Sequence, residues 1–168
     1  FDRAWLHEVL TSQPLSQVLD LDWDYQICSI QPAISYDFLV GWTKEPAISS
    51  DLIRQVKGAI KEDFLKESQS AVKNLEKGLR EGNQKDIETS IKRADKNLKS
   101  LNPLIYTPAL KELQESTEGL FACAKSSGAG GGDCGIALSF DPVETQTLID
   151  RWKKKNIEVI YQERMGDS

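Results

Sequence analysis

The sequence predicts an α+β fold in which helices pack on one face of a mostly antiparallel four-stranded sheet. Short segments with alternating apolar residues lie toward both ends of the chain, whereas the middle carries long segments with apolar residues three and four apart. The resulting order is strand, strand, three helices, strand, helix, strand, which is typical of α+β proteins. With 168 residues, the chain is long enough for one domain with a substantial core.

Composition excludes several classes of function. Hydrophobic residues make up 39% of the chain and charged residues 28%, as in ordinary globular proteins. The net charge of −5 disfavours nucleic acid or an anionic membrane as the main partner. No apolar run reaches the roughly 20 residues of a membrane helix. Cys28, Cys123 and Cys134 have no C-x-x-C spacing, so we expect a cytoplasmic protein with neither a disulfide framework nor a metal site.

The first part of the chain predicts two short helices and two strands. Residues 1–22 carry apolar side chains at helical spacing, interrupted near Pro14. Residues 23–28 alternate between apolar and polar side chains, as in a half-buried strand. Residues 38–42 form a continuous apolar run, which indicates a central strand covered on both faces.

Three helices are expected in the middle of the chain. The first has an apolar face over residues 53–79, with Ser49 or Ser50 as its N-cap. The second carries a regular apolar face over residues 87–101. The third starts at a threonine cap followed by proline, and its pattern covers residues 107–121.

The last part of the chain predicts strand, helix, strand. Residues 134–140 alternate between large and small side chains, as in a strand with two different faces. Asp141-Pro142 is a cap followed by proline and starts a helix that closes with three lysines, which suit the negative end of the helix dipole. Residues 157–161 form the last strand.

The stretch from Lys125 to Asp133, KSSGAGGGD, is the strongest functional signal. Four glycines and two serines lie between the third helix and the strand at residue 134. Glycine permits positive φ and close approach of a ligand, and successive exposed N–H groups form a concave anion site. The stretch therefore predicts a phosphate-binding loop, with a flexible connection as the alternative. Ser49 and Ser50 are a second anion candidate, although a plain helix cap is favoured.

Two common glycine motifs do not fit this stretch. A P-loop requires a lysine directly after its glycines, and none occurs here. The dinucleotide pattern G-x-G-x-x-G is present at Gly130, Gly132 and Gly135. That motif follows a strand and opens a helix, whereas we expect a helix before it and a strand after it.

Residues 125–138, KSSGAGGGDCGIAL, resemble the third signature motif of the GHMP kinases, named for galactokinase, homoserine kinase, mevalonate kinase and phosphomevalonate kinase. The paired serines and the Gly-Asp-Cys-Gly ending are most similar to the bacterial phosphomevalonate kinases. Residues 37–50, DFLVGWTKEPAISS, resemble the strand, loop and helix start that open the C-terminal half of this family, and YQERMG near the end also fits.

The resemblance implies a ferredoxin-like C-terminal domain over residues 1–168. The family's substrate-side lysine motif, P-x-x-x-G-L-x-S-S nucleotide loop and catalytic aspartate do not occur here. We therefore expect residues 1–22 to join this domain to a missing N-terminal ATP-binding domain. The intact enzyme would use ATP and Mg²⁺ to phosphorylate (R)-5-phosphomevalonate to the 5-diphosphate in the mevalonate pathway of isoprenoid biosynthesis. The chain alone would be inactive.

The resemblance also implies roles for the loop residues. Phosphate oxygens would be held by the backbone N–H groups of Ser127, Gly128, Ala129 and Gly130, by the hydroxyls of Ser126 and Ser127, and by the charge of Lys125. Lys125 could equally be a solvated cation at a helix end. Gly131 and Gly132 would permit the turn, and Asp133 would be structural because a carboxylate repels phosphate.

No catalytic residue is assigned to this chain, and two alternatives remain open. One is another GHMP member, such as mevalonate kinase or diphosphomevalonate decarboxylase. The other is a non-catalytic α+β module whose loop binds an anion, a peptide or nothing.

Overall fold

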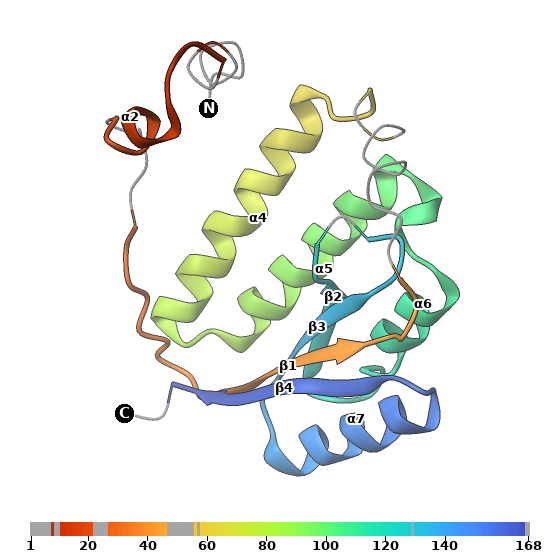
Figure 1. Ribbon diagram of the computed structural model, residues 1–168. Helices are drawn as coiled ribbons and strands as arrows, with labels where there is room; N and C mark the ends of the chain where they lie inside the picture. Colours follow the sequence, from red (N-terminus) through yellow and green to blue (C-terminus); the bar gives the residue numbers. More distant parts are fainter. Residues whose placement is uncertain are drawn as a thin grey trace.

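The computed structural model describes residues 8, 11–21, 27–46, 56, 58–128 and 130–166. Their central feature is an antiparallel sheet with the strand order β2-β3-β1-β4 (Figure 1). The strands are β1 (Tyr36–Trp42), β2 (Ala122–Ser126), β3 (Cys134–Ser139) and β4 (Glu158–Met165). The α+β class with a four-stranded antiparallel sheet is confirmed.

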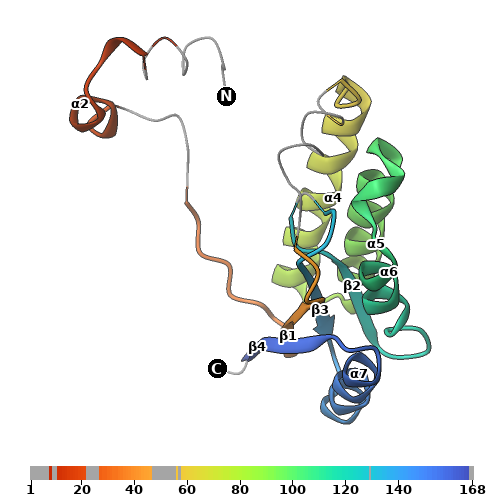
Figure 2. The same ribbon diagram turned by 45° about the vertical axis from the view of Figure 1, so that its right-hand side comes forward.

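The helices connect these strands in a β-α-β-β-α-β order, as in ferredoxin-like domains. Between β1 and β2 lie α4 (Glu62–Glu81), α5 (Gln84–Leu101), the short 3₁₀ helix η1 (Pro103–Ile105) and α6 (Pro108–Glu115). Between β3 and β4 lies α7 (Pro142–Lys154). One further helix, α2 (Leu15–Leu19), precedes the sheet and lies apart from it (Figure 2).

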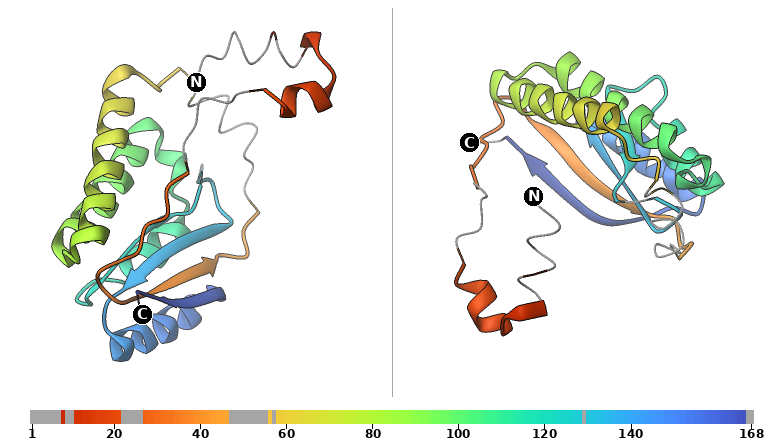
Figure 3. Two further views of the ribbon diagram at one scale, coloured as in Figure 1. Left: turned by 90° about the vertical axis from the view of Figure 1, so that its left-hand side faces the viewer. Right: turned by 90° about the horizontal axis from the view of Figure 1, so that it is seen from above.

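Helices cover both faces of the sheet, and the prediction of one covered face was wrong (Figure 3). α6 and α7 build the core on one face, where the fully buried Trp152 donates from its Nε1 to the carbonyl oxygen of Leu113 at 2.9 Å. On the other face, Ile87 and Ile91 of α5 pack against Cys123 and neighbouring strand residues, with α4 completing this second core. The α4–α5 hairpin is thus a layer added to the ferredoxin-like pair.

Side-chain caps explain why helix starts could be predicted. Thr107 accepts from the N–H of Leu110, and Asp141 accepts from two N–H groups at the start of α7. Gly82 ends α4 with a φ of 68°, and the following Asn83 caps α5. The predicted interruption near Pro14 also holds, since α2 begins directly after this residue.

One strand of the sheet, β2 (Ala122–Ser126), was not expected as a strand. The expected strand over residues 23–28 lies largely outside the described residues, and Ile27 and Cys28 have no regular structure. The fourth strand is β2 instead, in a segment where the third helix was expected to continue. That helix ends at Glu115, and Gly119, at a φ of 73°, turns the chain into β2.

The first of the three central helices starts later than expected. Its regular part begins at Glu62, after a turn at Gly58 and Ala59. The proposed caps Ser49 and Ser50 lie outside the described residues. Within the part of the chain that the structure describes, none of the helices has the length and apolar character needed to cross a membrane.

Candidate functional site

The glycine-rich loop connects β2 to β3, so a strand precedes it, not the helix that was expected. Ser126 pairs with Gly135 as the last pair of the ladder, and the N–H of Ser127 donates to the carbonyl oxygen of Cys134 at 3.0 Å. The loop is therefore the tip of a hairpin at the end of the sheet where β1 finishes.

Two neighbouring segments anchor the loop. On one side, the N–H of Gly131 donates to the carbonyl oxygen of Ile105 in η1 at 2.8 Å. On the other side, the N–H of Asp133 donates to the carbonyl oxygen of Glu45 at 2.6 Å. The carbonyl oxygen of Asp133 accepts from both the N–H and the hydroxyl of Thr43, at 2.7 and 2.8 Å. The backbone of Asp133 thus ties the loop to the end of β1, in keeping with a structural role.

The glycines of the loop differ in what their backbone requires. Gly130, Gly131 and Gly132 have φ values of 79°, 84° and 125°, which disfavour any residue with a side chain. A Cβ on Gly130 would also overlap the side chain and the carbonyl oxygen of Ile105. Gly128 has open space around the position of a Cβ. Packing therefore requires glycine at position 130 but not at position 128.

Several N–H groups of the loop have no hydrogen-bond partner among the described residues. Among the described residues, none accepts a hydrogen bond from the N–H of Gly128, Gly130 or Gly132. Gly130 and Gly132 are buried, a setting in which a backbone N–H normally has a partner. The unpaired N–H groups fit the predicted anion site, although Ala129 lies outside the described residues.

The two serines form hydrogen bonds within the hairpin. Ser126 is buried, and its hydroxyl donates to the carbonyl oxygen of Gly128 at 3.3 Å. The hydroxyl of Ser127 donates to the carbonyl oxygen of Cys134 at 2.9 Å. Of the predicted donors, the backbone N–H groups of Gly128 and Gly130 are those that the described protein leaves unpaired.

Lys125 lies in β2, so the alternative of a solvated helix end was wrong. Its ammonium group donates to the carbonyl oxygen of Ser126. Burial lowers the pKa of Lys125, and the negative charge of Asp95 opposes that shift. Lys125 is therefore a partly buried cation beneath the start of the loop.

A polar cluster behind Lys125 escaped sequence reasoning. Asp95 of α5 is buried, forms an ion pair with Lys99 at 2.9 Å and accepts from the amide of Gln114 at 2.5 Å. Tyr106, also buried, accepts from the N–H of Ser126 through its hydroxyl oxygen at 3.2 Å. Burial raises the pKa of Tyr106, and the neighbouring Asp95 carboxylate raises it further, so the hydroxyl keeps its proton.

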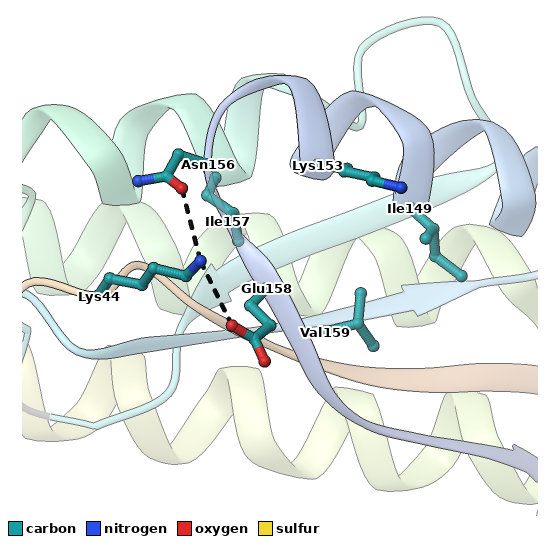
Figure 4. A pocket seen from close by; sticks show the side chains of 7 residues that line it. All are labelled: Lys44, Ile149, Lys153, Asn156, Ile157, Glu158 and Val159. Atoms are coloured by element: carbon teal, nitrogen blue, oxygen red, sulfur yellow. Dashed lines mark hydrogen bonds and ion pairs between the residues drawn. The ribbon is translucent and has the colours of Figure 1, made fainter.

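The described surface also has two shallow pockets away from the loop. One, of about 330 Å³, is lined by Ile149, Ile157 and Val159 together with polar side chains (Figure 4). Lys44 reaches across it to Asn156 and Glu158, at 3.5 and 3.3 Å. The other, of about 360 Å³, lies between α6 and α7. Neither is lined by a described residue of the loop.

The chain matches the model of a known protein family. The family model "GHMP kinases C terminal" matches residues 69–158, which is more than half of the chain. The matched segment includes α5, the glycine hairpin and α7.

Individual relatives agree with the family match. The phosphomevalonate kinase of Streptomyces sp. (strain CL190) is 29% identical over 148 residues, which are 82% of this chain and 40% of the relative. The crystal structure of Streptococcus pneumoniae phosphomevalonate kinase is 46% identical, with a TM-score of 0.91 over 98% of this chain and 51% of that one. Leishmania major mevalonate kinase in complex with R-mevalonate, 16% identical, shares the fold with a TM-score of 0.67 over 80% of this chain and 43% of that one.

The chain thus spans about half the length of the phosphomevalonate kinases that it matches. The family match covers the segment that contains β2, the glycine loop and β3. The chain belongs to the GHMP kinases, as a C-terminal domain of that family.

Proposed function

We propose that this chain is the C-terminal half of a phosphomevalonate kinase and that its glycine loop binds phosphate groups of the reactants. The proposal is carried by the similarity to the pneumococcal enzyme, at 46% identity over 98% of this chain. That enzyme has also been solved in complex with phosphomevalonate and AMPPNP. The reaction would transfer the γ-phosphoryl group of ATP to (R)-5-phosphomevalonate.

The chemistry of the loop suits this reaction. Both reactants carry several negative charges, so catalysis depends on positioning and on stabilising charge rather than on a covalent intermediate. The unpaired N–H groups of Gly128 and Gly130 would donate to phosphate oxygens, and Lys125 would add positive charge nearby. Because the loop is already anchored to Ile105 and Thr43, these donors would need little reorganisation.

The remaining parts of the site are assigned to an N-terminal half, to which residues 1–22 would connect. Exposed apolar side chains on β1 and β4, including Trp42, Ile160 and Tyr161, are available for contact with such a half. Among the described residues, no three histidine, cysteine, aspartate or glutamate side chains form a group that could hold a metal ion. Mg²⁺ would therefore be bound chiefly by the nucleotide phosphates and by residues of the other half.

Two activity assays test this assignment. The purified 168-residue chain should not phosphorylate phosphomevalonate with ATP. The same chain fused to the N-terminal half of the pneumococcal enzyme should do so. Turnover by the chain alone, with contaminating kinase excluded, would contradict the proposal that this chain holds only part of the active site. A fusion that phosphorylates mevalonate in preference to phosphomevalonate would favour another GHMP member.

A binding experiment tests the loop itself. Titration of the chain with inorganic pyrophosphate, followed by amide NMR, should shift the signals of Gly128 and Gly130 in a saturable manner. Signals of α7, on the opposite face from α5, serve as the internal control. If the loop signals stay unchanged, the loop is not a phosphate site and the chain is better described as an interaction module.

A further inference from the structure

The backbone of Ser126 is held by side chains through both its N–H group and its carbonyl group. Its N–H donates to the hydroxyl oxygen of Tyr106 at 3.2 Å, and its carbonyl oxygen accepts from the ammonium group of Lys125. Its own hydroxyl reaches forward to the carbonyl oxygen of Gly128. Ser126 is therefore the fixed point from which the loop departs.

The hydroxyl of Tyr106 is suited to this contact. Tyr106 is buried and directly follows η1. The last residue of η1, Ile105, accepts a hydrogen bond from the N–H of Gly131 through its carbonyl oxygen. Consecutive residues of one short segment thus hold both arms of the loop. A displacement of Tyr106 would move the start of the loop relative to its glycines.

Asp95 lies near Tyr106, because the ammonium group of Lys99 contacts both the Asp95 carboxylate and the Tyr106 ring. One carboxylate oxygen, Oδ2, is bound by Lys99 and Gln114. The other, Oδ1, is buried and has no hydrogen-bond partner among the described residues. Because the hydroxyl oxygen of Tyr106 accepts from Ser126, its proton remains available for this neighbouring carboxylate.

Two lysines near Asp95 offset its negative charge. Lys99 is paired with it at 2.9 Å, and its ammonium group also lies 4.6 Å from the ring centre of Tyr106. Lys125 is a further cation whose charged form is favoured by Asp95. A buried carboxylate behind a phosphate loop would otherwise repel the ligand.

We propose that Tyr106, supported by Asp95, is a positioning residue for phosphate binding: it holds Ser126 so that the N–H groups of Gly128 and Gly130 converge on one phosphoryl group. This proposal rests on the proposed function of the loop. Neither residue need touch the ligand. Their effect would pass through the hydrogen bond to Ser126.

The experiment compares Tyr106→Phe with Tyr36→Phe in the 168-residue chain. Tyr36 is the matched control, because it is also buried but lies at the opposite end of β1, and its hydroxyl has no hydrogen bond to the described residues. Each variant is titrated with pyrophosphate and followed through the amides of Gly128 and Gly130. Tyr106→Phe should weaken binding about threefold to tenfold, the range expected for one lost hydrogen bond, whereas Tyr36→Phe should not.

The outcomes separate the two proposals. If the unmodified chain does not respond to pyrophosphate, the proposed phosphate site fails, and this inference with it. If the chain responds and Tyr106→Phe binds equally well, the loop binds phosphate but Tyr106 does not position it.

A measurement on the unmodified chain covers the case in which Tyr106→Phe does not fold. If the Tyr106 contact and the ligand are coupled, binding must strengthen the contact by the same free energy. Pyrophosphate should then slow hydrogen exchange of the Ser126 amide more than that of amides in β4. Unchanged exchange at Ser126 under saturating pyrophosphate would overturn the proposal.

Discussion

Replacing Gly130 by alanine tests whether the loop is a built structure or a flexible connection. The left-handed φ of 79° costs a residue with a side chain about 1–2 kcal/mol. The overlap of the new methyl group with Ile105 adds about 1–3 kcal/mol, as in other overpacked sites. The variant should therefore lose about 2–5 kcal/mol of unfolding free energy.

Gly128→Ala is the matched control, because a methyl group there meets open space and the backbone is not left-handed. It should leave the free energy of unfolding within about 1 kcal/mol of the starting value. Urea unfolding, followed by circular dichroism, measures both. With a slope of about 2 kcal/mol per molar, Gly130→Ala should lower the midpoint by about 1–2.5 M. Equal midpoints for the two variants would show that the loop does not hold Gly130 against Ile105.

Three other substitutions probe the two cores. Burial raises the pKa of Cys123 from 9.0 to about 12, so the folded state keeps a proton that the unfolded state loses, and stability should fall by about 1.4 kcal/mol per pH unit across this window. Cys123→Ala should reduce that alkaline loss in urea titrations, and equal slopes would contradict the assignment. Trp152→Phe removes a buried hydrogen bond and leaves space, at a cost of about 1–3 kcal/mol in thermal unfolding. Thr145→Val removes the donor at 2.7 Å from the buried Asp37 and should cost about 1–3 kcal/mol, whereas Thr147→Val on the exposed side of α7 should be nearly neutral.

Local chemistry explains which elements the sequence predicts correctly. The predicted caps Thr107 and Asp141 act within three residues of their partners, so their signal survives in the sequence. The central strand β1 is a continuous apolar run because helices cover it on both sides.

β2 has no comparable signal. Ala122, Cys123 and Ala124 are small and all buried, so the segment has neither the alternation nor the branched side chains of a typical strand. It also follows directly on a helical pattern. The decisive interaction is pairing with β3, which no local pattern records.

In the candidate site too, one part has a local sequence signal and another part has none. Glycine spacing marks the loop from Lys125 to Asp133, because positive φ has a strong residue preference. Tyr106 meets the loop, and Asp95 comes near Tyr106 through Lys99, only once distant segments of the chain have packed together. In the sequence, Asp95 is one charge among many on an amphipathic helix.

The register of β1 has a consequence for how the chain folds. Trp42 pairs with Cys134 on one side and with Glu158 on the other. Both neighbours of β1 in the sheet are therefore strands that are synthesised much later in the chain. Such distant pairing is typical of domains that fold in milliseconds to seconds rather than microseconds. The α4–α5 hairpin, by contrast, joins neighbours in sequence across the Gly82 turn. During synthesis we expect this hairpin to form first. It can pack on a complete sheet only after β3 has been made, because β3 lies between β2 and β1.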